Sequence, residues 1–254
     1  MNKTTARLAP FALGLIVLGL WQGGLWITQT PSYIFPSPVD IVKAYIDDYK
    51  VLDAGLISTL TVTFTALAAA TVIGVALAIA MAASPLLRAA IHPWAVIIQV
   101  TPLVSVAPII YVLINQPFIT LVTCATIVAF FTILSNTAAG LAATPPELLD
   151  LFRLHGATKW QTLTQLSLPY ALPNFLTGLR IAGTLALIGA VVAEFVVGSG
   201  GFASGLAWQL IEASYRMIIP RMYAALMLLG ISGIIIYAAL GLLEKLLLAK
   251  RNRA

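Results

Sequence analysis

This sequence contains unusually few charged residues. Only 9% of its 254 residues are Asp, Glu, Lys or Arg, and 60% are hydrophobic, whereas soluble domains carry about 25% charged residues. So few charges cannot solvate the surface of a water-soluble domain, which excludes soluble enzymes and disordered chains. The single cysteine, Cys124, excludes an intrachain disulfide, and its apolar surroundings favour a buried side chain over a reactive thiol. The chain is therefore predicted to be an integral membrane protein.

Two further absences narrow the class. The sequence contains no Gly-x(4)-Gly-Lys-Ser/Thr motif and no Gly-Lys pair, so we expect no ATP site of the P-loop type in this chain. The apolar runs are long and continuous, whereas barrel strands would alternate over about ten residues. The predicted fold is therefore an all-α polytopic helical bundle. We expect lipid around it, no nucleic-acid partner, no metal site and no catalytic residue.

Six stretches have the length and composition of membrane-spanning helices. Their approximate ranges are 10–27, 56–83, 93–114, 118–143, 175–197 and 222–248. A signal peptide is the alternative for the first stretch, because a short basic lead precedes it. The missing small-x-small cleavage site favours an uncleaved span.

The segments between the spans complete the domain organisation. Residues 1–27 form a cytoplasmic lead and the first span, and residues 28–55 a periplasmic segment. Apolar residues at helical spacing in the latter predict a short amphipathic helix at the interface. Residues 56–248 form the core, and residues 249–254 a cytoplasmic tail.

The distribution of the basic residues predicts the orientation. With the N-terminus inside, ten of the fourteen Lys and Arg residues fall in inner segments and four in outer segments. Cytoplasmic segments of membrane proteins carry the excess of basic residues. Both termini are therefore predicted to be cytoplasmic.

One polar segment, residues 144–173, stands out between the fourth and fifth predicted spans. Pro145-Pro146 is typical of a helix start, and Glu147 and Asp150 would complement the dipole of its first turn. Gly156 is expected to end this helix or to let the chain turn. The sequence thus predicts a short helix at the cytoplasmic surface.

A second amphipathic stretch follows at residues 158–168, and Pro169 and Pro173 mark the return into the membrane. The two short helices would present Phe152, Arg153, His155 and Trp160. Aromatic and basic side chains together are typical of a docking surface. A solvated loop, or an interfacial helix without a partner, remains the alternative from composition alone.

The spacing within this segment resembles a known motif. Asp150-Leu151-Phe152 is followed after three residues by Gly156, and nine residues later by Leu166-Ser167-Leu168-Pro169. This resembles the EAA loop of bacterial ABC-importer permeases: Glu-Ala-Ala, three residues, Gly, nine residues, then Ile-x-Leu-Pro. The flanking residues 156–163 and 168–180 are also similar to that family. Residues 190–206 resemble its nitrate/sulfonate/taurine-type branch, and the resemblance extends from about residue 56 to the C-terminus.

The resemblance implies that the segment is a coupling helix, which docks in a groove of a cytoplasmic ATPase. The residues that it assigns to coupling are Asp150, Leu151, Phe152, Arg153, His155, Gly156, Ala157, Trp160, Leu168 and Pro169. Leu151 and Phe152 stand where the family has two alanines, so the partner would need a matching pocket.

The resemblance also implies the assembly and the cargo. It predicts a homodimer in the bacterial inner membrane, with two ATPases, a periplasmic substrate-binding protein and no cofactor of its own. The outer segments 28–54 and 198–221 would dock the binding protein, or would serve only as lid loops. The cargo would be a small organic solute, either sulfonate- or taurine-like or a heterocyclic vitamin precursor.

Polar residues within the spans are candidates for the transport path, because each is costly unless it faces protein or water. They are Glu194, Gln99, Thr101, Ser105, Asn136 and Thr184. A structural hydrogen bond is the alternative for Glu194, and bonds to their own helix are expected of the hydroxyl groups. Pro102 and Pro108 are expected to break or kink the third span.

Other classes of membrane protein make different predictions. An ion-coupled secondary transporter would need paired intramembrane charges and an internal inverted repeat, and the sequence offers one clear intramembrane acid. An intramembrane enzyme is disfavoured, because His92 and His155 fall in or beside cytoplasmic segments and Ser199 on the opposite side. Composition alone does not exclude a membrane scaffold that only binds other proteins, although the spacing of the motif in segment 144–173 argues against it.

Overall fold

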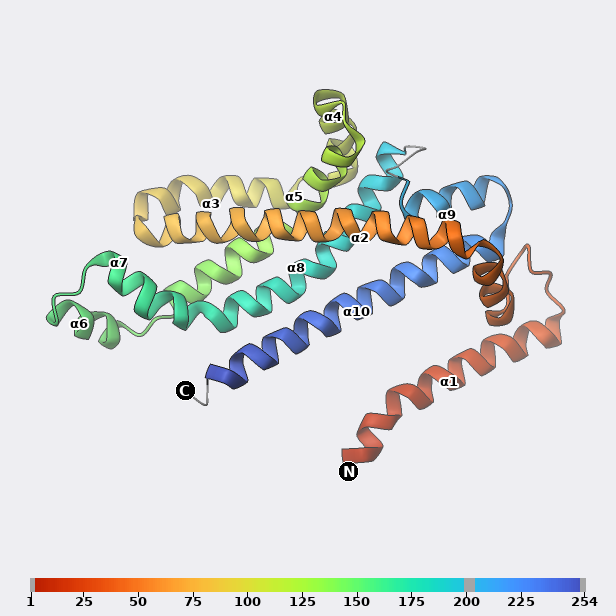
Figure 1. Ribbon diagram of the computed structural model, residues 1–254, viewed down its shortest axis with the longest axis horizontal. Helices are drawn as coiled ribbons and strands as arrows, with labels where there is room; N and C mark the ends of the chain where they lie inside the picture. Colours follow the sequence, from red (N-terminus) through yellow and green to blue (C-terminus); the bar gives the residue numbers. More distant parts are fainter. Residues whose placement is uncertain (1–2, 199–203, 252–254) are drawn as a thin grey trace.

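The computed structural model describes residues 3–198 and 204–251, and within these ranges every regular element is a helix. In chain order the elements are α1 (Lys3–Thr28), α2 (Pro38–Ala83), α3 (Pro85–Val100), α4 (Leu103–Ile114), α5 (Pro117–Ala142), α6 (Pro146–Leu154), α7 (Lys159–Thr162), the π-helix η1 (Leu163–Ser167), α8 (Leu168–Val197), α9 (Leu206–Tyr215) and α10 (Ile219–Arg251). The long helices run side by side, with α6 and α7 at one end and α9 at the other (Figure 1). These are called the α6–α7 end and the α9 end below.

Four described stretches are long and apolar enough to cross a membrane: Pro38–Ala83, Pro117–Ala142, Lys159–Val197 and Ile219–Ala249. The bent pair α3 and α4 makes a fifth if it is counted as one span, and Ala12–Thr28 is a shorter apolar helix. The predicted all-α membrane bundle is confirmed. The predicted number of six spans is reached only if α1 crosses the membrane and the bent pair α3 and α4 crosses it as one span.

The predicted interfacial helix is joined to the second predicted span across a kink. Its residues form the first part of α2, which bends at Asp48 (φ −113°, ψ 18°) and continues to Ala83. Ser37 starts α2 with a capping box, because its hydroxyl accepts from the Asp40 N–H and the Asp40 carboxylate accepts from the Ser37 N–H. No proline occurs between Pro38 and Pro85, so the non-helical backbone angles of Asp48 make this kink without one.

The predicted third span is broken into two helices. α3 and α4 are bent by 103° at Thr101 and Pro102. Pro102 has no N–H to donate and disfavours helical geometry in the residue before it, so Thr101 is extended (φ −73°, ψ 125°). The break expected at Pro102 is confirmed, whereas Pro108 lies within α4. The predicted start at residue 93 is wrong, because Ser84 caps a helix that begins at Pro85.

The return into the membrane also differs from the prediction. α7, η1 and α8 follow one another without a break, so Lys159–Val197 forms one helical stretch. Pro169 lies in the first turn of α8 and Pro173 within it. The wider π-helical turn of η1 precedes Pro169, and such turns let a helix carry a residue that cannot donate. The prolines therefore do not separate the surface helices from the span.

The centre of the bundle is the contact between α5 and α8, against which α2 packs. Small residues allow this close approach: a Cβ added to Gly178 would lie 2.6 Å from the Cβ of Asn136 on α5. A Cβ added to Gly140 would lie 2.9 Å from the carbonyl oxygen of Ala171 on α8. Close backbone approach through small residues is the usual way in which helices associate in lipid. α5 and α8 are therefore held at a fixed spacing.

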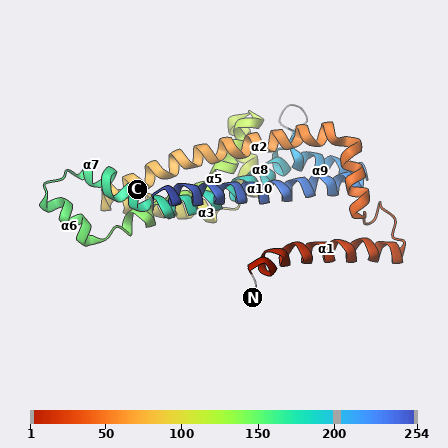
Figure 2. The ribbon, with the colours of Figure 1, turned by 60° about the horizontal axis from the view of Figure 1, so that its bottom comes forward.

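α1 lies apart from this bundle, as both views show (Figures 1 and 2). Its contact runs through aromatic rings: Trp21 lies 5.4 Å from Phe35, which lies 5.7 Å from Tyr223 of α10. The described side chains in the middle of α1, including Leu15 and Leu20, are exposed.

A buried carboxylate joins three helices at the α9 end. Glu194 of α8 is 3% exposed. It accepts hydrogen bonds from the Thr59 hydroxyl of α2 (2.8 Å) and from the Ala207 N–H of α9 (3.0 Å). The Leu206 N–H donates to the same Thr59 hydroxyl (2.9 Å). Glu194 and Thr59 therefore satisfy the free N–H groups at the start of α9, and a carboxylate there also complements the helix dipole.

Gly205 makes this arrangement possible, because a Cβ at this position would overlap the Glu194 carboxylate. We therefore expect Gly205→Ala to displace the carboxylate and to leave buried polar groups unpaired, at a cost of about 1–3 kcal/mol. The apparent melting temperature of the purified chain in detergent measures this loss. Gly230→Ala is the matched control, since a Cβ there meets open space. Equal melting of the two variants would contradict the structural role of Glu194.

Candidate functional site

The segment between α5 and α8 projects beyond the long helices at the α6–α7 end (Figure 1). Pro146 lies in the first turn of α6, where a missing N–H costs nothing, and Glu147 follows in the same turn. Arg153 lies in the last turn, where a cation complements the helix dipole. The local sequence thus specifies both ends of α6, as predicted.

Gly156 forms the turn between the two surface helices. Its φ of +70° lies in the left-handed region, which glycine adopts without a Cβ penalty. The Gly156 N–H donates to the Arg153 carbonyl and the Ala157 N–H to the Phe152 carbonyl, both at 3.0 Å. This pair of bonds is a Schellman motif, in which glycine takes the first position after the cap. The turn predicted at Gly156 is confirmed.

A capping box starts the second surface helix directly after this turn. The Thr158 hydroxyl accepts from the Gln161 N–H (3.2 Å), and the Gln161 side-chain oxygen accepts from the Thr158 N–H (2.8 Å). The direction of the chain is therefore fixed on both sides of Gly156. The projecting segment is an ordered turn between two helices rather than an unstructured loop.

Large apolar side chains on this segment face solvent. No residue of α6 is buried, and Leu154 is 84% and Trp160 70% exposed. Exposed apolar groups beside charged ones on a projecting segment mark a surface that contacts another molecule. The Asp150–Arg153 ion pair (2.9 Å) is itself exposed, so it adds little to stability. The exposed side chains of the segment therefore contribute little to the packing of the bundle.

Half of the predicted coupling residues line one hollow on this segment. The hollow has a volume of about 450 Å³ and is lined by Leu151, Phe152, His155, Gly156, Ala157, Gln161 and Gln165. The His155 ring nitrogen Nδ1 lies 2.8 Å from the Leu151 carbonyl oxygen, which orients the imidazole. The hollow combines apolar walls with amide and imidazole groups.

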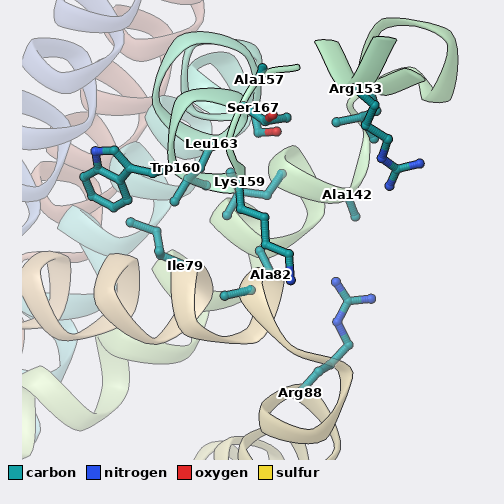
Figure 3. Close-up of a pocket in the computed structure, with 14 residues that line it drawn as sticks. Ile79, Ala82, Arg88, Ala142, Arg153, Ala157, Lys159, Trp160, Leu163 and Ser167 are labelled. Atoms are coloured by element: carbon teal, nitrogen blue, oxygen red, sulfur yellow. The ribbon is translucent and has the colours of Figure 1, made fainter. Parts of the chain in front are cut away.

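The other predicted coupling residues lie elsewhere. Arg153 and Trp160, with Ala157, line a second cavity that faces α2 and α3 (Figure 3). Leu168 and Pro169 lie in the first turn of α8. Asp150 pairs with Arg153 and lines neither cavity. The structure thus divides the predicted set between the tip of the segment, its inner side and the base of α8.

The predicted transport-path residues do not form one cluster. Gln99 and Thr101 lie at the end of α3 and Ser105 in α4, so these three flank the bend between the helices. The side chains of Asn136 (to Thr132, 2.8 Å) and Thr184 (to Ile181, 2.8 Å) donate to carbonyls of their own helices. Glu194 has the partners described above. Asn136 and Thr184 thus make the bonds within their own helices that were the structural alternative.

Sequence reasoning missed a cavity of about 880 Å³ near the α9 end. Its lining is mainly apolar, with the aromatic ring of Phe118 and one cation, Lys50. Ser58 and Thr61 supply hydroxyls, and Gln209, which is buried, supplies an amide. The sequence pattern that could have indicated this cavity is the spacing of Ser58 and Thr61, which stand three residues apart and so lie on one face of a helix.

An ion pair between α8 and α10 was also missed. Arg180 lies 3.5 Å from the Glu244 carboxylate and stacks over the Tyr237 ring, 3.8 Å from its centre. The Thr177 hydroxyl donates to the same carboxylate (3.0 Å). The partners come from helices far apart in the sequence, so no local pattern relates them. The contacts tie the two helices together near the α6–α7 end.

Comparison with known proteins agrees with the family resemblance. The profile of the family described as "Binding-protein-dependent transport system inner membrane component" matches residues 51–249. The formylaminopyrimidine transport permease ThiX of Halalkalibacterium halodurans is 32% identical over 254 residues, which are 100% of both chains. The riboflavin transport system permease RibX of Chloroflexus aurantiacus is 31% identical, over 93% of this chain and 89% of its own.

A more distant relative and a solved structure support the branch and the fold. The putative aliphatic sulfonates transport permease SsuC of Bacillus subtilis is 24% identical over 94% of this chain and 86% of its own. An inward-facing structure of the MetNI methionine ABC transporter matches with a TM-score of 0.68 at 21% identity, and covers 78% of this chain and 97% of that one. The predicted importer-permease branch is confirmed. The chain belongs to the family of binding-protein-dependent transport system inner membrane components, the permease subunits of ABC importers.

Proposed function

We propose that this chain forms the membrane path of an ABC importer that carries a small organic solute from the periplasm to the cytoplasm by alternating access. ATP hydrolysis takes place in a separate ATPase, so the chain itself is not an enzyme. The observation that carries this proposal is the projecting segment α6–Gly156–α7. It combines the motif spacing of the family with exposed apolar side chains and a fixed turn.

The segment docks on the ATPase through the hollow lined by Leu151, Phe152 and His155. A movement of the docked segment would reach the transport path through α8. Because α7, η1 and α8 are continuous, a displacement of α7 moves a helical stretch that extends to Val197. Near its far end Glu194 holds the start of α9. A stiff helix packed at fixed spacing on α5 is a physical link between the two ends of the bundle.

The assembly comprises two copies of this chain, two ATPases and a periplasmic binding protein in the bacterial inner membrane. The basic residues support the orientation with the α6–α7 end in the cytoplasm. The binding protein would then dock at the α9 end, on the predicted outer segments. The part of segment 198–221 from residue 199 to 203 lies outside the described residues. An ion-coupled transporter without an ATPase is disfavoured by the family match.

We propose a heterocyclic vitamin or vitamin precursor as the cargo, rather than a sulfonate. The relatives named for formylaminopyrimidine and riboflavin are 32% and 31% identical to this chain, and the aliphatic-sulfonate relative is 24% identical. The 880 Å³ cavity supports the same class of cargo. It offers an aromatic ring, hydroxyls and an amide but only one cation, Lys50. Apolar walls with few polar groups suit a flat heterocycle better than a sulfonate anion.

The coupling role is tested at Gly156, where a Cβ would meet open space but the backbone φ is positive. We expect Gly156→Val to distort the turn, because a β-branched residue is strained by about 1–3 kcal/mol in this region. ATP-dependent uptake into proteoliposomes that hold the complete importer should fall at least roughly tenfold. Co-purification of the ATPase should weaken as well.

Gly156→Asn is the matched control, since asparagine tolerates the left-handed conformation and should keep most of the uptake. The chain should reach the membrane in equal amounts in both variants. If Gly156→Val retained both the ATPase and transport, the docking assignment would be wrong.

The cargo is tested with the same complete importer, binding protein included. Formylaminopyrimidine or riboflavin should stimulate ATP hydrolysis and accumulate in the vesicles, whereas taurine should do neither. Phe118→Ala should lower the uptake of the heterocycle by several-fold, because stacking of a base on an aromatic ring is worth about 1–3 kcal/mol. Stimulation by taurine alone would refute the heterocycle assignment and leave the permease assignment intact.

A further inference from the structure

Three cationic side chains converge on the cavity between the projecting segment and the long helices. Arg88 of α3, Arg153 of α6 and Lys159 of α7 line this space of about 660 Å³. Figure 3 shows their charged ends directed toward the same opening from different elements. No carboxylate is among the described residues that line the cavity. Like charges gathered in one cavity repel one another, and an anion between them would remove that cost.

These cations have little compensation from the protein itself. Arg153 pairs with Asp150, but that pair is exposed. Within the described part of the chain, the ion pairs do not include Arg88 or Lys159. Both are exposed, so their charges are available to a ligand. The site offers a guanidinium fork and an ammonium group, the two donors that proteins use most for phosphate.

The rest of the cavity is mostly apolar, with hydroxyls from Thr162 and Ser167. Ile79, Leu141, Leu149 and Leu163 line it, and the indole of Trp160 lies at its edge. Arg88 also lines two smaller cavities, of about 290 and 300 Å³, whose other lining residues are largely apolar and include Met81 and Phe131. A cationic centre beside apolar hollows fits a molecule with an anionic head and hydrocarbon chains. A soluble phosphate would leave these hollows without a partner.

We infer that this cavity binds the phosphate head group of an anionic phospholipid of the inner leaflet, with its acyl chains along α2, α3 and α5. The placement in that leaflet rests on the orientation given under the proposed function. A bound head group would bridge Arg88 on α3 and Lys159 on α7. It would thereby tie the projecting segment to the long helices, and lipid composition would influence how firmly this segment is held. Anionic lipids are attracted by basic residues at this surface.

The test is native mass spectrometry of the full-length chain purified in detergent and titrated with phosphatidylglycerol. We expect tighter binding of phosphatidylglycerol than of phosphatidylcholine with the same chains. The double variant Arg88→Gln, Lys159→Gln should lose affinity for phosphatidylglycerol roughly tenfold or more. Both side chains are exposed, so this variant should fold normally. The charge-retaining variant Arg88→Lys, Lys159→Arg should keep most of the affinity.

The matched control removes two exposed cations from the α9 half of the chain, Lys43→Gln and Arg216→Gln, and should leave the affinity unchanged. The inference is overturned if this control loses as much as the test variant, or if phosphatidylcholine binds equally well. It is also overturned if glycerol 1-phosphate binds as tightly as phosphatidylglycerol, because the ligand would then be a soluble phosphate. None of these measurements needs transport, so they stand apart from the test of the coupling role.

Discussion

The close contact between α5 and α8 is the interaction on which the rest of this structure depends. Lipid supplies little hydrophobic force between helices, so their association relies on dispersion contacts at short range. Gly140 and Gly178 allow that range, because even one added carbon would crowd the facing helix. The resulting contact with α5 restricts the movement of α8 along its length. A force on one end of α8 is therefore transmitted along a helix that α5 holds in place.

The two ends of this supported helix carry different chemistry. At one end α8 continues into η1 and α7, and Gly156 sets the direction of the projecting segment. At the other end Glu194 uses its buried carboxylate to hold the start of α9. A carboxylate buried without partners would be costly, so its bonds to Thr59 and Ala207 explain how an acid persists in an apolar helix. The projecting segment and the start of α9 are thus joined by one element, α8.

What the sequence could predict was local. The turn at Gly156 and the break at Pro102 follow from the backbone limits of those residues, and both occur where expected. The union of the interfacial helix with the second span was not predicted, because a bend at Asp48 without proline or glycine leaves no compositional mark. The partners of Glu194 and of Arg180 lie on other helices, and only the packed bundle relates them.

Site-specific photocrosslinking tests the central claim most directly, that the projecting segment is where the ATPase acts on this chain. A photoreactive residue would replace Leu154 at the α6–α7 end, or Tyr215 at the α9 end. Both are among the most exposed side chains, at 84% and 86%. The proposed docking role predicts that the ATPase is captured from position 154 and not from position 215. Capture from position 215, or equal capture from both, would contradict the account.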